Sequence, residues 1–357
     1  MPSLAGQPAA AGGALDSDRM FAATAALPEQ LRDAAEAARQ VDTGPLRNGP
    51  GTRSIAVLGM GGSGVAGAVL EAFGADRLPV PVGLVNDYRL PRWVGPGTLC
   101  FAVSCSGNTE ETLAAAEEAV ERGATLVTVS TGGSLEALAV ETGSVHYRVP
   151  GDIVWPRAAI GALSAPLLVA CERAGLLEGA SAEIAKAVDQ LSLRRDALVV
   201  AGGGVAAALA ARIGSTIPLV YGAAPCGAVA ARRWKTQVNE NPKAPAFSAV
   251  QPELCHNEVC GWGVGGDVTR QVVTIVDLRS DHDHPRVKRR FELVDEIVRE
   301  AVAGIEVVHA EGEGVLAQMM DLVIVGDFVS LHMAAAFGVD PGPIPVLMDL
   351  KEKLASE

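Results

Sequence analysis

The stretch Ser54-Ile-Ala-Val-Leu-Gly-Met-Gly-Gly-Ser-Gly64 carries the strongest signal for the fold of this chain. Residues 54–58 form a short apolar run that predicts a buried strand, and the glycines that follow predict a tight turn. The alanine-rich segment 65–73 then predicts a helix. A buried strand that leads through a glycine turn into a helix is typical of α/β proteins with a parallel sheet.

Apolar runs and helical patterns continue to alternate along the chain. Each predicted strand is apolar throughout, which indicates a parallel sheet covered by helices on both faces. The pattern restarts at residues 196–200, where DALVV runs into the turn AGGG, and this restart predicts a second unit of similar element order. The other predicted strands are 81–86, 98–104, 124–130, 217–221, 272–277 and 305–309, and the other predicted helices are 109–122, 205–213, 228–237, 288–303 and 314–337.

We therefore predict an α/β fold of two similar αβα units, each a flavodoxin-like parallel sheet flanked by helices. Residues 1–17 are predicted to be a mobile N-terminus, and residues 18–192 the first unit with a helical lead-in and a connector. Residues 193–338 are predicted to form the second unit, and residues 339–357 a tail that closes with a helix.

Charge restricts the partners that this chain of 357 residues can bind. Its 29 Lys and Arg residues against 42 Asp and Glu residues give a net charge of −13. Proteins that bind nucleic acid or anionic membranes usually carry a basic face, so we expect neither partner. A small phosphorylated ligand remains compatible with this charge, because it needs only a local group of N–H and hydroxyl donors.

The cysteines and the apolar runs bear on the compartment. The six cysteines form no CxxC pair, which indicates reduced thiols. Residues 1–18 have neither the basic segment nor the apolar core of a signal peptide. Because no uninterrupted apolar run reaches about 18 residues, we expect a cytoplasmic protein without a membrane span.

The glycine loop, residues 59–64, has three interpretations. Its spacing fits the GxGxxG pattern of dinucleotide-binding folds, and Asp87 stands near the end of the next predicted strand, where those folds place an acid. It also fits a tight turn in which only glycine has room. In the third interpretation, its amides and the Ser63 hydroxyl approach a sugar or a phosphate.

The hydroxyl loop, residues 104–109, favours the third interpretation. Its sequence SCSGNT follows a predicted strand and opens a helix, and it gathers Ser104, Ser106 and Thr109. These hydroxyls and the positive end of the helix dipole suit a phosphate monoester. A plain helix N-cap is the alternative, although it would need one hydroxyl rather than three.

At this point the sequence resembles a known family. GMGGSG followed about forty residues later by SCSGNTEET is similar to the SIS (sugar isomerase) domain. Together with NENPKAP, HNEVCGW and the C-terminal LKEKL, residues 20–357 resemble the bifunctional phosphoglucose/phosphomannose isomerases of the phosphoglucose isomerase superfamily. The resemblance implies a homodimer that needs no cofactor and no metal. It also implies an aldose–ketose isomerase that converts glucose 6-phosphate to fructose 6-phosphate through a cis-enediol, with mannose 6-phosphate left open as a second substrate.

The resemblance also assigns roles to single residues. Glu240 is implied to be the base, His256 and Lys351 to open the sugar ring, and Arg157 to hold the charge of the enediolate. The residues implied to bind the substrate are Gly62 and Ser63, close to the sugar, and Ser104, Ser106 and Thr109 at the phosphate.

Taken alone, each of these residues also has a plainer interpretation. Glu240 could be a solvated carboxylate in a polar loop after a helix that ends near Gln237, His256 a structural histidine, and Lys351 an exposed helix lysine. Cys255 and Cys260, or the run at 282–284, could suggest a metal site, but no second ligand pair has metal spacing.

Three other functions compete with the isomerase. A non-catalytic SIS-domain sensor of sugar phosphates would not need Glu240, His256 and Lys351 together. A dinucleotide oxidoreductase is disfavoured by the hydroxyl loop, and a glutamine-dependent aminotransferase by the lack of an N-terminal nucleophile cysteine.

The sequence also departs from the family pattern. Cys105 replaces a common aromatic residue, and Gly342 a common hydroxyl residue, which leaves the substrate range open. The turn AGGG of the second unit lacks hydroxyls, so we expect no phosphate there.

Overall fold

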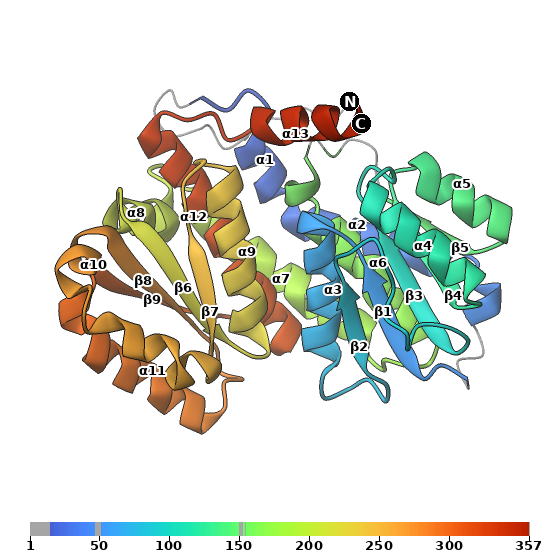
Figure 1. Cartoon of the computed structure of the whole chain (residues 1–357), viewed down its shortest axis with the longest axis horizontal. Coiled ribbons are helices and arrows are strands. Elements are labelled where there is room, and N and C mark those ends of the chain that lie inside the picture. The colour runs from blue at the N-terminus through green and yellow to red at the C-terminus, as the bar shows by residue number, and fades with distance from the viewer. Residues whose placement is uncertain (1–14, 47–50, 150–152, 154, 357) are drawn as a thin grey trace.

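The computed structural model describes residues 15–46, 51–149, 153 and 155–356. Most of the predicted mobile N-terminus lies outside these residues. The described chain contains two parallel sheets with helices on both faces of each (Figure 1). The predicted α/β class is confirmed.

The first sheet has five parallel strands in the order β2-β1-β3-β4-β5. Its two central strands bury nearly every side chain, which explains why their sequences read as continuous apolar runs. Sequence reasoning missed only the short edge strand β5. The strands are β1 (Ser54–Leu58), β2 (Val82–Val85), β3 (Thr98–Val103), β4 (Thr125–Ser130) and β5 (Val145–Arg148).

The second sheet has four parallel strands in the order β7-β6-β8-β9. The edge strand β7 was not predicted, because three of its five side chains are exposed and its sequence is not an apolar run. The strands are β6 (Ile217–Ala223), β7 (Phe247–Gln251), β8 (Val273–Arg279) and β9 (Gly304–His309).

The two sheets share a central layer of helices (Figure 1). This layer contains α1 (Met20–Ala25), α2 (Leu27–Gln40), α3 (Gly61–Gly74), α6 (Ile160–Arg173), α7 (Ala180–Leu198), α8 (Gly204–Ile213), α9 (Cys226–Glu240) and α12 (Val315–Phe337). The outer faces carry α4 (Glu110–Glu121) and α5 (Gly133–Thr142) on the first sheet, and α10 (Gly266–Val272) and α11 (Pro285–Val298) on the second. The last helix, α13 (Pro345–Ala355), lies at the top of the view, above α1 (Figure 1).

Helix α12 is the core helix of the second unit. By length and composition it could cross a membrane, with a mean hydropathy of 1.6 over its most apolar window. However, 83% of that window is buried inside the protein. Its two buried carboxylates also have partners, since Asp321 pairs with Arg194 at 2.7 Å and Asp327 pairs with Arg233. These contacts identify α12 as a buried helix of a folded core.

The predicted strand at 196–200 is wrong, and with it the predicted register of the repeat. Helix α7 continues to Leu198, which is buried on the same face as Ile184 and Leu191. These positions are seven residues apart, so the helical period continues through the apolar letters of DALVV. The strand order instead makes β6 the counterpart of β1, because each lies second in its sheet and feeds a central helix.

Close backbone contacts support this corrected register. A Cβ on Gly59 would lie 2.9 Å from the carbonyl of Val103 at the end of β3, and one on Gly64 would lie 2.9 Å from the Gly59 carbonyl. In the second unit, a Cβ on Gly227 would lie 2.8 Å from the carbonyl of Leu278 in β8, and one on Gly222 would meet the Gly227 carbonyl. The same spacing of five residues therefore serves the same strand-to-helix turn in both units.

Candidate active site

The hydroxyl loop lies at the carboxyl end of the first sheet, between β3 and α4. The Oγ of Ser104 and the Oγ1 of Thr109 are 2.8 Å apart, and the amide of Gly107 donates to Ser104 Oγ at 3.1 Å. No side chain caps the start of α4. Within the described residues, the amides of Glu110 and Glu111 have no acceptor, so they remain available to an anion.

Two further predicted residues join this loop. The buried Ser63 hydroxyl, in the glycine loop, accepts a hydrogen bond from the amide of Cys105 at 3.3 Å. Ser106 is exposed, and its hydroxyl accepts from the amide of Asn108 at 3.2 Å. The Cys105 side chain packs into the core, so its departure from the family pattern does not alter the surface of the loop.

Gly62 connects the glycine loop to Arg157. A Cβ at Gly62 would lie 3.2 Å from the carbonyl of Pro156 and 3.3 Å from the Cα of Arg157. A side chain at this position would therefore be in unusually tight contact with the backbone of the Arg157 segment. The loop that bonds to the hydroxyl loop on one side thus packs against the Arg157 segment on the other.

Arg157 is almost completely buried, with 3% of its surface exposed. Its Nε donates to Asn241 Oδ1 at 2.9 Å, and its Nη2 donates to the carbonyls of Pro341 at 2.5 Å and Gly342 at 2.7 Å. Its Nη1 has no hydrogen-bond partner among the described residues, and it lies 4.0 Å from Glu240 Oε2. Arg157 is therefore fixed on two nitrogens and presents the third beside Glu240.

Glu240 is the last residue of α9, and the prediction that it lies in a loop after this helix is wrong. The helix ends just before Pro242, which cannot continue it. The carboxylate is 27% exposed, and burial raises its pKa above the ordinary value. The positive charges of Arg157 and Arg233 oppose that rise. The result is a half-buried carboxylate in a cationic surrounding.

An ion pair that sequence reasoning missed holds Arg157 in place. The buried Arg233 of α9 donates to both carboxylate oxygens of Asp327, from Nε at 2.9 Å and from Nη2 at 2.7 Å. The same Nη2 donates to the carbonyl of Arg157 at 2.6 Å. Gln237 donates to Asp327 at 3.0 Å. Arg233, Gln237 and Asn241 are spaced four residues apart, so a polar stripe on a buried helix face was the available sequence signal.

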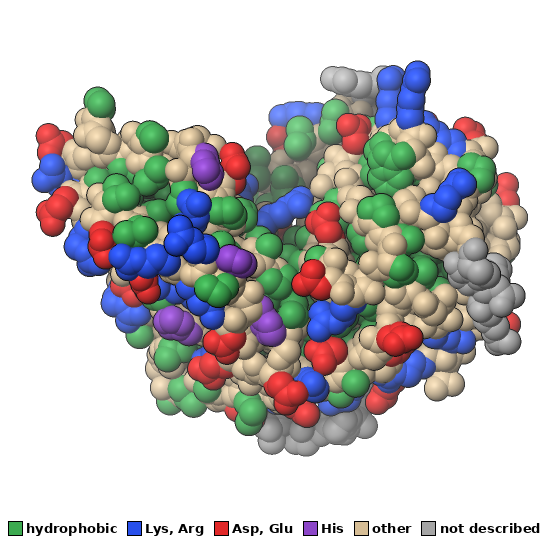
Figure 2. Space-filling model, turned by 90° about the horizontal axis from the view of Figure 1, so that it is seen from below, with side chains coloured by type: hydrophobic (Ala, Val, Ile, Leu, Met, Phe, Trp, Pro, Cys, Tyr) green, Lys and Arg blue, Asp and Glu red, His purple; other side chains and the backbone are tan. Residues whose placement is uncertain are grey.

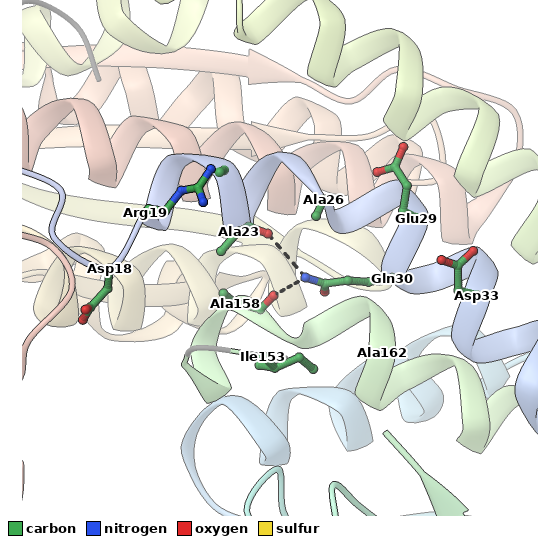
Figure 3. A pocket seen from close by; sticks show the side chains of 11 residues that line it. Asp18, Arg19, Ala23, Ala26, Glu29, Gln30, Asp33, Ile153, Ala158 and Ala162 are labelled. Atoms are coloured by element: carbon green, nitrogen blue, oxygen red, sulfur yellow. Dashed lines mark hydrogen bonds between the residues drawn. The ribbon is translucent and has the colours of Figure 1, made fainter. Parts of the chain in front are cut away.

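Contacts from the N-terminal helices also support the turn that carries Arg157 (Figure 3). A cavity of about 410 Å³ lies between α1, α2 and this turn. At its wall, Gln30 Nε2 donates to the carbonyl of Ala158 at 2.8 Å. Asp18 accepts from the indole of Trp155 at 2.7 Å. A Cβ on Gly342 would lie 2.7 Å from that of Asp18, so a larger residue at 342 would require Asp18 to move.

The structure does not bring His256 to Glu240. Helix α9 starts at the carboxyl end of the second sheet and runs back over its 15 residues, about 22 Å at 1.5 Å per residue. Glu240 therefore lies at the amino end of the sheet. His256 follows β7 at the carboxyl end, where it is exposed. The two residues lie at opposite ends of one unit.

The loop that carries His256 has an internal anchor. The hydroxyl of the buried Tyr221, on β6, donates to Glu258 Oε1 at 2.5 Å. Burial and the Glu258 charge raise the pKa of Tyr221, so this hydroxyl remains a donor. Glu258 is two residues from His256, and its bond to the sheet restricts the loop.

Lys351 also stays outside the Arg157 cluster. It is exposed on α13 and has no hydrogen bond or ion pair within the described residues, whereas Lys353 pairs with Asp349 at 2.7 Å. In the described part of the chain, no three His, Cys, Asp or Glu side chains are grouped to hold a metal.

Comparisons with known proteins agree on one family. Residues 204–354 match the model of the bacterial phospho-glucose isomerase C-terminal SIS domain. A bifunctional phosphoglucose/phosphomannose isomerase from Caldicellulosiruptor bescii is 34% identical over 342 residues, which cover 94% of this chain and 99% of the relative. An enzyme of the same name from Aquifex aeolicus is 34% identical over 85% of this chain and 90% of its own length.

Solved structures share the fold at lower identity. The C-terminal domain of glucosamine-fructose-6-phosphate aminotransferase from Francisella tularensis matches with a TM-score of 0.68 at 16% identity, over 90% of this chain and 96% of that one. A glucose-6-phosphate isomerase like protein from Thermus thermophilus matches with a TM-score of 0.57 at 21% identity, over 93% and 98% of the two chains.

The Arg233–Asp327 pair can be tested by comparing a variant that removes one charge with a variant that removes both. Arg233→Met leaves the buried Asp327 carboxylate without its cation and should cost about 3–5 kcal/mol of unfolding free energy. Arg233→Met combined with Asp327→Leu removes both charges and should cost less than Arg233→Met alone. Arg212→Met, which breaks the exposed pair with Glu306, should cost at most about 1 kcal/mol. Urea unfolding measures the free energy of unfolding of these three variants and of wild type. A double variant as unstable as Arg233→Met would show that the pair is not the source of the stabilisation.

Proposed function

Because the chain belongs to the family of bifunctional phosphoglucose/phosphomannose isomerases, we propose that it converts glucose 6-phosphate and mannose 6-phosphate to fructose 6-phosphate. The observation that carries the proposal is the unpartnered Nη1 of Arg157 at 4.0 Å from Glu240. An aldose–ketose isomerase needs a carboxylate that moves a proton between C2 and C1, and a cation beside it for the enediolate oxygens.

Glu240 takes the C2 proton and returns it to C1. Its half-buried position raises its pKa, which strengthens it as a base, while the charge of Arg157 opposes that rise. The free Nη1 donates to the enediolate oxygen as negative charge develops there. Protons are the only species that move in these steps, so the reaction needs no redox cofactor, and Arg157 supplies the positive charge for which other enzymes use a metal.

The hydroxyl loop binds the phosphate in this proposal. Ser104, Ser106 and Thr109 supply neutral donors, and the open amides of α4 add the positive end of the helix dipole. Gly62 and Ser63 lie between this loop and Arg157, and this arrangement supports a bound hexose phosphate whose sugar carbons extend toward Glu240.

A sensor without catalysis would use the same hydroxyl loop. However, it would gain nothing from burying Arg157 with an unsatisfied nitrogen beside a carboxylate of raised pKa. A buried donor without a partner costs about 1–3 kcal/mol, and such a cost is expected where a reaction uses the donor. This comparison favours the enzyme.

We further propose a cytoplasmic homodimer in which His256 of the partner subunit completes each site. In one chain, His256 and Glu240 lie at opposite ends of the second sheet, so ring opening by His256 requires a second copy. Helix α13 supports association, because it exposes Val346 by 70%, Leu350 by 55% and Leu354 by 54%. Lys351 lies on this same helix and would assist ring opening. The six free cysteines suit a reducing compartment.

The reaction is tested by coupled assays for fructose 6-phosphate from each aldose phosphate. Wild type should convert both substrates, with and without EDTA. Glu240→Gln keeps the size of the side chain but cannot accept the C2 proton, so kcat should fall at least 10²–10⁴-fold, the order typical of a general base, with KM nearly unchanged. In tritiated water, wild type should incorporate label and the variant should not. Near-normal turnover and exchange in Glu240→Gln would remove Glu240 as the base.

The pH dependence tests the pairing of Glu240 with Arg157. The base works when deprotonated, so kcat/KM should rise with pH through the raised pKa of Glu240. Arg157 lowers that pKa, so Arg157→Gln should move this acid limb to higher pH and reduce kcat by roughly 10²–10³-fold. Arg157→Lys keeps the charge and should leave the limb near its wild-type position. If the acid limbs of the pH profiles of wild type and Arg157→Gln coincide, the charge of Arg157 does not set the pKa of Glu240.

Hybrid dimers test whether the site is shared between subunits. Glu240→Gln and His256→Ala homodimers should each be nearly inactive. When they are mixed and allowed to exchange subunits, each hybrid regains one site with both residues intact, so about a quarter of wild-type turnover should return. The chain carrying both substitutions, mixed with wild type, provides the control for exchange itself. Failure to regain activity, with hybrids demonstrated by mass, would place His256 outside the shared site.

A further inference from the structure

A second cavity lies at the carboxyl end of the second sheet, away from Glu240. Its volume is about 390 Å³. The ends of β6 and β7 form one wall, with Ala223 and Gln251, and the first turns of α11 form the other, with Arg286 and Arg290. Among the described residues, no acidic side chain lines it.

In the corrected repeat, this cavity of the second unit occupies the position that corresponds to the hydroxyl loop in the first unit. There β3 leads into α4, and here β8 leads into α11. The donors differ. Pro285 has no N–H, and the amide of Arg286 already donates to His284 Nδ1 at 3.1 Å. The start of α11 therefore offers no open amide comparable to those of α4, and any anion must be held by side chains.

Two arginine side chains are placed for this purpose. Arg286 and Arg290 are four residues apart on one face of α11, and within the described chain neither guanidinium has a hydrogen bond or an ion pair. The other cations of this turn are occupied, since Arg289 pairs with Glu292 at 2.6 Å and Lys288 donates to the Asp281 carbonyl at 2.9 Å.

The positive charge of this region stands out in a chain of net charge −13. On the face seen from below, a run of Lys and Arg side chains crosses the half of the molecule that contains the second unit (Figure 2). Helix α11 lies along the lower edge of that unit (Figure 1). Local charge of this sign raises the concentration of anions near the cavity.

Gln251 gives an independent indication of a ligand. Its side chain lines the cavity and is only 2% exposed. Its Oε1 accepts from the Cys255 thiol at 3.0 Å, whereas its Nε2 has no partner among the described residues. A buried N–H group without an acceptor is rare in folded proteins. An oxygen of a bound anion would satisfy it.

We propose that this cavity is a second binding site, for the phosphate group of a small phosphorylated sugar. Arg286 and Arg290 hold the phosphate oxygens, for which guanidinium geometry is well suited, and Gln251 Nε2 donates to the same ligand. The volume is that of a site for a metabolite rather than for a bare ion. The site goes beyond the isomerase proposed above and uses none of its residues. Through Gln251 and Cys255 it contacts the loop that carries His256.

Equilibrium dialysis of the full-length protein with labelled glucitol 6-phosphate tests the site. This probe has no carbonyl group and cannot be isomerised. Ser104→Ala with Thr109→Val weakens binding at the hydroxyl loop, so one molecule per chain should remain bound at the second cavity. Adding Arg286→Ala and Arg290→Ala should weaken the remaining binding at least roughly tenfold, because two charge-assisted hydrogen bonds are lost. Gln251→Leu should weaken it less.

A matched control removes the same charge elsewhere. Arg270→Ala with Arg289→Ala deletes two exposed arginines that do not line the cavity, and binding should stay within about twofold if local contacts rather than net charge decide it. Glucitol without phosphate should not bind. Inorganic phosphate should bind more weakly than glucitol 6-phosphate. If phosphate binds more strongly, the proposal that the ligand is a phosphorylated sugar is wrong.

Two results would overturn the site itself: no residual binding after the Ser104 and Thr109 substitutions, or equal losses in the control and in the Arg286 and Arg290 variant. Matching thermal unfolding curves of these variants show that folding is intact. Turnover of the Arg286→Ala and Arg290→Ala protein is measured separately. If the isomerase assay fails while one molecule of glucitol 6-phosphate per chain still binds at the second cavity, the proposed reaction is rejected and the second site stands.

Discussion

The buried pair of Arg233 and Asp327 is the contact on which the candidate active site depends. Two charges removed from water are stable only when each has a partner in good geometry. Besides its bonds to Asp327, Arg233 donates a hydrogen bond from Nη2 to the carbonyl of Arg157 at 2.6 Å. This bond fixes the backbone of Arg157, while Asn241 and the carbonyl of Gly342 fix its side chain. The guanidinium is left with one free nitrogen and almost no freedom to move. Preorganisation of this kind lets a donor stabilise developing charge without first rearranging.

Chain direction decides which residues can share a site. In a parallel sheet, the helix after a strand must return to the amino end before the next strand begins. Helix α9 does this, so it delivers Glu240 to the amino end of the second sheet, where it faces the carboxyl end of the first. The following strand then carries the chain back toward His256. No local rearrangement of one loop can reverse that separation. In the homodimer proposed above, the two residues of one site come from different subunits.

The sequence predicted those parts of the fold in which local pattern and final environment agree. The central strands are buried on both faces and therefore read as apolar runs. The strand predicted at 196–200 was wrong because a strand and a buried helix can share four apolar letters, and only the seven-residue spacing from Ile184 and Leu191 to Leu198 distinguishes them. The motifs pointed to Glu240 and Arg157, whose side chains lie 4.0 Å apart in the structure. They gave no sign of Asp327, which is 94 residues from Arg233 and lies in a predominantly apolar helix. Pairings of this kind arise only when tertiary packing brings distant residues together.

The two units show how one backbone plan can carry different chemistry. Both use a pair of glycines five residues apart to bring strand, turn and helix together, and this constraint is steric, so it leaves no freedom at those positions. The residues that face the ligand are under no such constraint. In the first unit, the helix starts with open amides beside small hydroxyls, a surface suited to a phosphate group without a cation. In the second, Pro285 has no N–H and the Arg286 amide is bonded to His284, so the donors available at this helix are the side chains of Arg286 and Arg290. A duplicated fold therefore need not keep a duplicated function, because the steric frame and the donors that it presents vary independently.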